Sequence, residues 1–211
     1  MESLAIIAEF NPFHTGHARL IRQVRQAAGP EAAIVIIMSG AFVQRGEPAF
    51  FDKWHRAAWA IDGGADVVIE LPAVYALSSA AGFAQGGVTL AARLGCQALA
   101  CGVEGGTAAD FLSLARRSEG LTACLKAAKK SSAGQQLTDA LMAAAPDEAR
   151  LLQQPNALLA FEYARAMLKQ EQPLTFLPLP RQGRHGDTGL GAAFASASAL
   201  RQAMRCSGPA E

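Results

Sequence analysis

The sequence predicts an α/β protein whose core is a doubly wound, Rossmann-like parallel sheet. One supporting observation is a series of short, mainly apolar runs, as expected of strands in a buried parallel sheet: 4–8, 32–38, 66–71, 98–103 and 174–179. The other is that the segments between these runs carry apolar residues at helical spacing: 16–28, 52–61, 80–94 and 156–169. Strands that alternate with helices favour a parallel sheet, which binds ligands beyond the carboxyl ends of its strands.

Local residues support the individual elements in chain order. We expect Asp52 to cap the second helix, because an acidic side chain suits the positive end of a helix dipole. Pro72 stops the third strand and Gly95 ends the third helix. Thr107 and Asp110 have the spacing of a capping box at the start of a further helix.

The rest of the chain is expected to be largely helical, apart from the last strand at 174–179. No strand-like run occurs in 107–150, so we expect a helical insertion there that lies against the sheet. A helix is expected to open at Asn156, whose default role is to cap it. After the last strand, a Gly-rich loop over 182–193 leads into a short final helix from Ser196.

Composition limits the class of protein. With 211 residues, 51% of them hydrophobic, the chain is expected to form one domain over 1–211. No apolar run reaches about 18 residues and no basic segment opens the chain, so we expect a cytoplasmic protein without a membrane span. A net charge of +1 argues against a general field that would hold nucleic acid. The four cysteines form no C-x-x-C pair and are expected to be free thiols, without a metal site.

One motif at the end of the first strand carries chemistry. Residues 9–17 read EFNPFHTGH, so His14 and His17 stand where a helix begins. The N-terminus of a helix presents unpaired N–H groups and a positive dipole end, which favour an anion. Gly16 lets a phosphate or a planar base approach the backbone closely. We therefore expect a nucleotide phosphate site at which both histidines stabilise the charge of an in-line transition state.

The H-x-G-H turn after a first apolar strand resembles the HIGH-type nucleotidyltransferase superfamily. The longer strings IIAEFNPFHTGH, MSGAFVQRGEPAFFDKW, GGADVVIELP and QPNALLAFEYA resemble, more specifically, the bacterial tRNA(Met) cytidine acetate ligase family. The resemblance runs from about residue 4 to residue 204. It implies a HIGH-type doubly wound fold and an enzyme that activates acetate with ATP as acetyl-adenylate. The acetyl group is then transferred to the wobble cytidine of elongator tRNA(Met).

The resemblance also implies roles for particular residues. His14 and His17 would be catalytic. ATP contacts are implied along the first strand, turn and helix: Ile7, Ala8, Glu9, Phe10, Asn11, Pro12, Phe13, Thr15, Gly16 and Leu20. Further ATP contacts are implied later in the chain: Gly102, Asn156, Arg181, Gln182, Ser196 and Ser198. From its position alone, Ser196 is equally well an ordinary helix cap.

Other polar residues past the second strand are candidates from their position alone. Arg45 and Lys53 follow the carboxyl end of that strand, where they could contact a triphosphate or the carboxylate of acetate. A solvated loop is the alternative for either residue. No protein ligand for a metal is identified, and a Mg²⁺ ion is expected to accompany the leaving pyrophosphate.

Three functions remain open from the sequence. The first is the acetate-activating, tRNA-acetylating enzyme, with ATP, acetate and tRNA(Met) as its partners. The second is an adenylyltransferase that acts on a small phosphorylated metabolite, and the third is a nucleotide-binding protein without catalysis. Members of the ligase family continue past the serine-rich segment into an extension that helps to hold tRNA. We therefore expect the adenylation core within these 211 residues and the main RNA contacts outside them.

Overall fold

The structure is a computed structural model that describes residues 2–44, 46–125, 133–181 and 197–206. Within these residues, five parallel strands form a single sheet. The strands are β1 (Ser3–Ala8), β2 (Ala33–Ser39), β3 (Val67–Leu71), β4 (Ala98–Val103) and β5 (Thr175–Pro180). Their spatial order is β3-β2-β1-β4-β5, and every neighbouring pair is parallel. The predicted doubly wound α/β fold is therefore confirmed, with strand bounds within two residues of those expected.

Strand β1 lies at the centre of the sheet. Ile6 is in register with Ile36 of β2 on one side and with Ala100 of β4 on the other. The chain first adds strands towards β3 and then crosses back to add β4 and β5. The order of the strands thus reverses between β1 and β4, which is where sheets of this kind open a crevice for a ligand.

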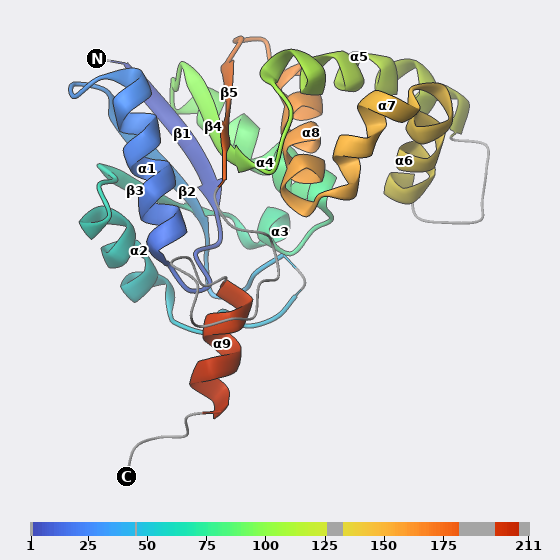
Figure 1. Ribbon diagram of the computed structural model, residues 1–211. Coiled ribbons are helices and arrows are strands. Elements are labelled where there is room, and N and C mark those ends of the chain that lie inside the picture. Colours follow the sequence, from blue (N-terminus) through green and yellow to red (C-terminus); the bar gives the residue numbers. More distant parts are fainter. Residues whose placement is uncertain (1, 45, 126–132, 182–196, 207–211) are drawn as a thin grey trace.

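Helices cover both faces of the sheet (Figure 1). Helices α1 (Thr15–Ala28) and α2 (Lys53–Asp62) lie on one face, while α4 (Ala80–Arg93), α5 (Ala108–Leu125) and α8 (Pro155–Met167) lie on the other. Because strand side chains alternate, Leu4 and Ile6 join the apolar cluster under α1 and α2. Ala5 and Ile7 join the larger cluster on the opposite face. Burial on both faces explains why the inner strands β1, β2 and β4 are almost entirely apolar, whereas the edge strands β3 and β5 are partly exposed.

Apart from Thr107 and Ala145, every described residue of 107–150 is helical. The segment contains α5, α6 (Ala133–Ala144), α7 (Pro146–Ala149) and the start of a 3₁₀ turn over Arg150–Gln153. The predicted capping box is confirmed, since Thr107 N–H donates to Asp110 Oδ2 over 2.8 Å and Asp110 N–H donates to Thr107 Oγ1 over 3.3 Å. A short helix that was not predicted, α3 (Ala73–Ala76), directly follows Pro72.

The last helix, α9 (Ala197–Cys206), lies beyond the edge of the sheet formed by the carboxyl ends of the strands (Figure 1). The predicted glycine-rich loop at 182–193 and the predicted helix start at Ser196 lie outside the described residues. Within the described part of the chain, no helix is both long and apolar enough to span a membrane. Cys96 and Cys101 are buried free thiols, as predicted, and burial raises the pKa of Cys101 to about 12.

Candidate functional site

The two histidines of the H-x-G-H motif form the N-terminal cap of α1. His14 occupies the N-cap position, and its Nδ1 accepts a hydrogen bond from the backbone N–H of Gly16 over 3.0 Å. The Nδ1 of His17 accepts in turn from the backbone N–H of His14 over 3.3 Å. Because a ring nitrogen that accepts carries no proton, both imidazoles are neutral and protonated at Nε2. Each Nε2–H is thereby available to donate to an anion at the helix start.

The two rings are packed against each other and against Phe10. The His14 and His17 rings stack with their centroids 3.8 Å apart, and the Phe10 ring lies 4.8 Å from that of His17. Burial lowers the pKa of His14 to about 4, with the charge of Arg181 as a second cause. Burial also lowers the pKa of His17 well below its usual range, helped by His14 and Arg181. The electrostatics therefore agree with the hydrogen bonds: both rings are neutral donors at pH 7.

Gly16 is required by the position of the His14 ring. A Cβ atom on residue 16 would lie 2.9 Å from Cε1 and 3.0 Å from Nδ1 of His14. Only glycine lets the ring fold back over the first turn of the helix and accept the hydrogen bond from its N–H. The glycine of the motif thus positions a histidine, in addition to the close ligand approach expected from the sequence.

A second group of polar side chains lies at the carboxyl ends of β4 and β5. Arg181 directly follows β5, and its backbone N–H donates to the carbonyl of Val103 over 2.8 Å. Its side chain crosses over Gly102, where a Cβ would lie 2.8 Å from Arg181 Cγ. The guanidinium then donates to Oδ1 of Asn156 over 2.9 Å. The structure therefore brings together three of the predicted site residues, Gly102, Asn156 and Arg181.

Asn156 does not cap its helix, so this expectation from the sequence was wrong. Helix α8 begins at Pro155, and the side chain of its N-cap residue, Gln154, forms no capping hydrogen bond. The carboxylate of Glu104 takes that role, because its Oε2 accepts from the N–H of Ala157 over 3.1 Å. Glu104 Oε1 also accepts from the side-chain amide of Asn156, which leaves the amide oxygen facing Arg181.

Sequence reasoning did not single out Glu104. The sequence feature that could have indicated a role for it is its position as an acidic residue directly after the fourth apolar strand. In the structure it orients Asn156 and thereby Arg181, whose positive charge acts on both histidines. Helix α1 approaches the same rim, since a Cβ on Gly102 would lie 3.9 Å from Leu20. The two groups thus face each other across the switch point between β1 and β4.

The turn that connects β1 to α1 is held by its neighbours. Glu9 accepts from the N–H of Gln44 over 2.7 Å, and the buried Asn11 side chain accepts from the N–H of Phe50 over 2.7 Å. Arg201 of α9 donates to the carbonyl of Asn11 and, over 3.3 Å, to the hydroxyl of Ser198. Helix α9, with the predicted Ser198, is thereby fixed beside the start of α1.

Arg56 is a further residue that the sequence-based prediction missed. It is fully buried on α2 and donates to four backbone carbonyls: Glu9 over 2.6 Å, Ser39 and Phe51 over 3.0 Å each, and Gly40. Burial lowers its pKa, although nearby carboxylates oppose the shift. The sequence feature that could have revealed its burial is its position one turn before Ala60, on the apolar side of an amphipathic helix. Arg56 ties the end of β1 to the end of β2.

The remaining predicted residues are distributed around this core. Ile7 and Phe10 are buried, one in each of the two apolar clusters. The side chain of Thr15 is exposed at the start of α1.

Lys53 lies at the β2–β3 side and forms an ion pair with Glu70 over 2.5 Å, away from the histidines. Asp52 caps α2 as predicted, accepting from two backbone N–H groups. Arg45, Gln182 and Ser196 lie outside the described residues.

The family of the chain follows from comparison with known families. A family model described as HIGH Nucleotidyl Transferase matches residues 1–210. The chain belongs to the HIGH nucleotidyl transferase family. The matched range includes the H-T-G-H turn at the start of α1.

Within the HIGH nucleotidyl transferase family, the chain is similar to proteins named tRNA(Met) cytidine acetate ligase. It is 40% identical over 205 residues to one from Pediococcus pentosaceus and 41% identical over 217 residues to one from Syntrophomonas wolfei, with 96% and 97% of this chain covered. Those matches cover 53% and 51% of the relatives, so the chain spans about half of their length.

Two crystal structures of Thermotoga maritima TmcAL resemble the fold. The apo form matches with a TM-score of 0.84 and 31% identity, over 98% of this chain and 52% of that one. The form bound with alpha-thio ATP also has a TM-score of 0.84, at 33% identity over 97% of this chain and 50% of that one. A structural relative of this chain therefore binds an ATP analogue.

Proposed function

We propose that the chain binds ATP at the switch point between β1 and β4 and transfers the adenylyl group to acetate, forming acetyl-adenylate. The observation that carries the proposal is the pair of neutral imidazoles at the N-terminus of α1, with the charge of Arg181 close enough to lower the pKa of both. The structure of TmcAL with alpha-thio ATP supports a nucleotide in this fold. We further propose that 1–211 form one nucleotidyltransferase domain, with 107–150 as a helical insertion.

In the proposed reaction, a carboxylate oxygen of acetate attacks the α-phosphorus of ATP. The new bond joins this oxygen to the α-phosphorus in the mixed anhydride. The bond from the α-phosphorus to the oxygen that bridges it to the β-phosphate breaks, and pyrophosphate leaves. The Nε2–H groups of His14 and His17 donate to phosphate oxygens, whose charge grows in the transition state. Neutral imidazoles suit this task because their donor geometry is fixed by the hydrogen bonds at Nδ1.

Arg181 and Asn156 are proposed to hold the nucleotide on the opposite side of the crevice. Asn156 orients the guanidinium, which is exposed and therefore accessible to a ligand. Gly102 is proposed to let the nucleotide lie close to the backbone at the end of β4. On the other side, Ser198 and Arg201 of α9 lie beside the β1–α1 turn, a position that suits the β- and γ-phosphates.

Mg²⁺ is proposed to arrive with ATP. The described residues contain no group of three or more His, Cys, Asp or Glu side chains that could hold a metal ion. Mg²⁺ commonly keeps several waters and binds through substrate phosphates, so this donor set is compatible with a metal carried by the triphosphate. When bound, the ion would offset charge on the leaving pyrophosphate.

The acetyl group is proposed to pass to the wobble cytidine of elongator tRNA(Met). Support for this step comes from the relatives named tRNA(Met) cytidine acetate ligase, of which the chain spans about half. The exocyclic amine of cytidine would attack the acetyl carbonyl, AMP would leave and the amine would lose a proton. The mixed anhydride is already reactive, so positioning of the amine supplies most of the required catalysis.

Acetate-dependent exchange of labelled pyrophosphate into ATP tests the first step. We expect exchange with acetate in the wild type and little exchange in a His17→Ala variant. Absence of exchange with acetate, or its persistence in that variant, contradicts the proposal. Pyrophosphate release with phosphopantetheine or nicotinamide mononucleotide would instead indicate an adenylyltransferase. ATP binding without turnover on any substrate, tRNA included, would indicate a nucleotide-binding protein.

A further inference from the structure

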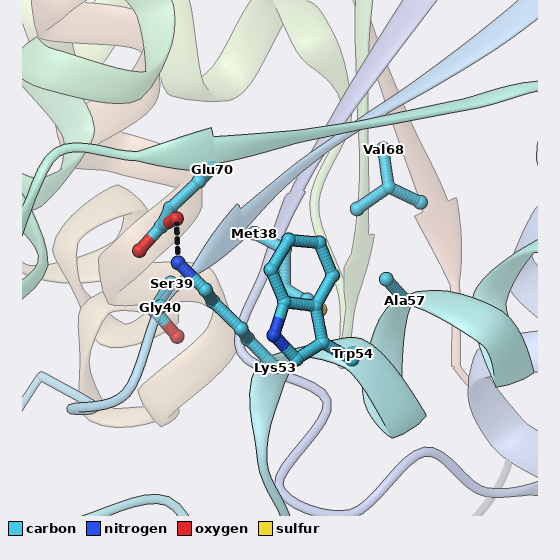
Figure 2. Close-up of a pocket in the computed structure, with 8 residues that line it drawn as sticks. All are labelled: Met38, Ser39, Gly40, Lys53, Trp54, Ala57, Val68 and Glu70. Atoms are coloured by element: carbon cyan, nitrogen blue, oxygen red, sulfur yellow. Dashed lines mark hydrogen bonds and ion pairs between the residues drawn. The ribbon is translucent and has the colours of Figure 1, made fainter.

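A cavity outside the histidine–arginine site lies at the carboxyl ends of β2 and β3. It is a shallow, half-open hollow of about 310 Å³, a volume that includes space open to solvent. Its walls come from β2, β3 and the first turns of α2: Met38, Ser39, Gly40, Lys53, Trp54, Ala57, Val68 and Glu70. Figure 2 shows the Trp54 ring between the apolar side chains of Ala57 and Val68 and the Lys53–Glu70 pair.

The aromatic wall of the cavity is unusually open. The Trp54 side chain is 74% exposed, the highest value among the large hydrophobic residues that the structure describes as exposed. Met38, Ala57 and Val68 provide apolar surface beside it. A flat ring left in solvent next to apolar groups is the kind of platform on which nucleic-acid bases stack.

The opposite edge of the cavity is polar and carries both signs of charge. Lys53 Nζ lies 2.5 Å from Glu70 Oε2 and also over the Trp54 ring, 5.2 Å from its centroid, so a base that stacks on this face of the ring must displace the ammonium. Glu70 reaches this place because residue 40 is a glycine, where a Cβ would lie only 2.0 Å from Glu70 Oε1. The cavity thus combines one aromatic face, one carboxylate acceptor and one ammonium donor.

This combination matches cytosine better than acetate or uracil. The Watson–Crick edge of cytosine presents an amine donor next to ring-nitrogen and carbonyl acceptors, and a glutamate accepts from that amine. Lys53 can donate to the acceptors. Uracil presents a carbonyl where cytosine has its amine, so Glu70 would repel it. A free acetate would meet the same repulsion from Glu70, with the charge of Lys53 already offset.

The cavity is connected to the proposed ATP site through Arg56. The Arg56 guanidinium donates to the backbone carbonyls of Ser39 and Gly40, two residues that line the cavity. It also donates to the carbonyl of Glu9, just before the H-x-G-H turn. The cavity is on the β2–β3 side of β1, whereas Gly102 and Arg181 are on the β4–β5 side.

We propose that the cavity formed by Lys53, Trp54 and Glu70 is a subsite for an unpaired cytosine base of an RNA substrate. The base stacks on Trp54 while Glu70 accepts from its amine. This inference rests on the proposed function, in which a cytidine is the acetyl acceptor.

Titration of the chain with cytidine 5′-monophosphate or uridine 5′-monophosphate tests the subsite directly, with the indole N–H signals of the two tryptophans followed by NMR. Trp54→Phe assigns the signals. We expect the cytidine nucleotide to shift the Trp54 signal and to bind about tenfold more tightly than the uridine nucleotide. Trp54→Ala should weaken cytidine binding about tenfold or more. Glu70→Gln should remove the preference for cytosine, because an amide can both accept and donate.

Glu148→Gln is the matched control, since Glu148 forms an ion pair of similar exposure with Arg117 far from the cavity in sequence and in the fold. It should leave nucleotide preference unchanged. Equal shifts with both nucleotides, or a preference that survives Glu70→Gln, overturn the subsite. A Trp54 signal that responds to protein concentration and not to cytidine nucleotide also overturns it, in favour of contact between copies of the chain. The titration contains no acetate, so its result does not depend on the pyrophosphate-exchange test. If the chain exchanges pyrophosphate but shows no preference for the cytidine nucleotide, only the subsite is refuted.

Discussion

The Nδ1 of His17 accepts a hydrogen bond from the backbone N–H of His14, 3.3 Å away, while the His14 ring caps the same helix through Gly16. The two side chains therefore form a reciprocal capping box in which imidazoles replace the usual serine and glutamate. This arrangement gives each histidine two functions. Its Nδ1 stabilises the helix start, and its Nε2–H remains for the ligand.

A His14→Asn substitution should separate these two functions. Asparagine is a good N-cap residue, so its side-chain oxygen can accept from the N–H of Gly16 and preserve the start of α1. It lacks the Nε2–H, so acetate-dependent pyrophosphate exchange should fall by about 10²-fold or more. The measurement is the exchange rate at saturating ATP, with the melting temperature recorded for the same sample.

His14→Ala is the matched comparison, since it removes the cap as well as the donor. It should lose exchange to a similar extent but also lower the free energy of unfolding by about 1 kcal/mol. Near wild-type exchange in the asparagine variant would show that the His14 donor does not act on the phosphate.

The stability of the chain should fall as the pH is lowered from about 6.5 towards 4. The pKa of His14 is about 4 in the folded state against an ordinary value of 6.5, and that of His17 is also lowered. Between these values the unfolded chain binds protons that the folded chain does not, so acidification favours unfolding. Urea unfolding at several pH values measures the effect. A His14→Asn, His17→Asn double variant should show a smaller decrease over the same window, and an equal decrease would argue against neutral histidines.

Arg181→Gln should raise the pKa of His14 and weaken ATP binding. The positive charge of Arg181 is the second cause of the low His14 pKa, after burial, so its removal takes away one of the two effects. The His14 pKa is measured from the ring C–H resonance during an NMR titration, and ATP affinity by calorimetry. We expect ATP affinity to fall about tenfold with the loss of a charge-assisted contact. An unchanged His14 pKa would place Arg181 too far from the histidines to share a ligand with them.

The sequence was sufficient to predict the strands, because the inner strands are buried on both faces and therefore read as nearly uninterrupted apolar runs, and the edge strands keep mainly apolar segments bounded by glycine or proline. It was also sufficient for the H-x-G-H turn, whose residues are adjacent in the chain. Contacts between distant residues were not predictable. Glu104 was missed because its role depends on Asn156, 52 positions further along. Arg56 was missed because its partners are backbone carbonyls, which no residue type reveals. Asn156 was given a capping role because the local pattern did not show that Pro155 already begins the helix.

Gly16→Ala should impair activity with little loss of stability. Alanine is favoured over glycine within a helix by up to about 1 kcal/mol, which partly offsets the disturbance of the cap. The new Cβ would stand 2.9 Å from His14 Cε1, so the imidazole must move away from the N–H of residue 16. We expect pyrophosphate exchange to fall about tenfold or more, since a small misplacement of a donor is costly. Gly120→Ala, on α5 where a Cβ meets no atom within 4 Å, is the matched control and should retain full exchange.

Arg56→Met should be among the most destabilising single substitutions in the chain. Its guanidinium is fully buried and satisfies the carbonyls of Glu9, Ser39, Gly40 and Phe51, which methionine would leave without their donor. We expect the free energy of unfolding to fall by about 3 kcal/mol or more, as measured by urea denaturation. Arg56→Lys should also destabilise the chain, because an ammonium cannot reproduce the planar fork of donors that spans these carbonyls. Arg117→Met, which breaks an exposed ion pair with Glu148, should change stability by less than about 1 kcal/mol. If Arg56→Met and Arg117→Met were equally mild, the ends of β1 and β2 would not depend on the buried arginine for their relative position.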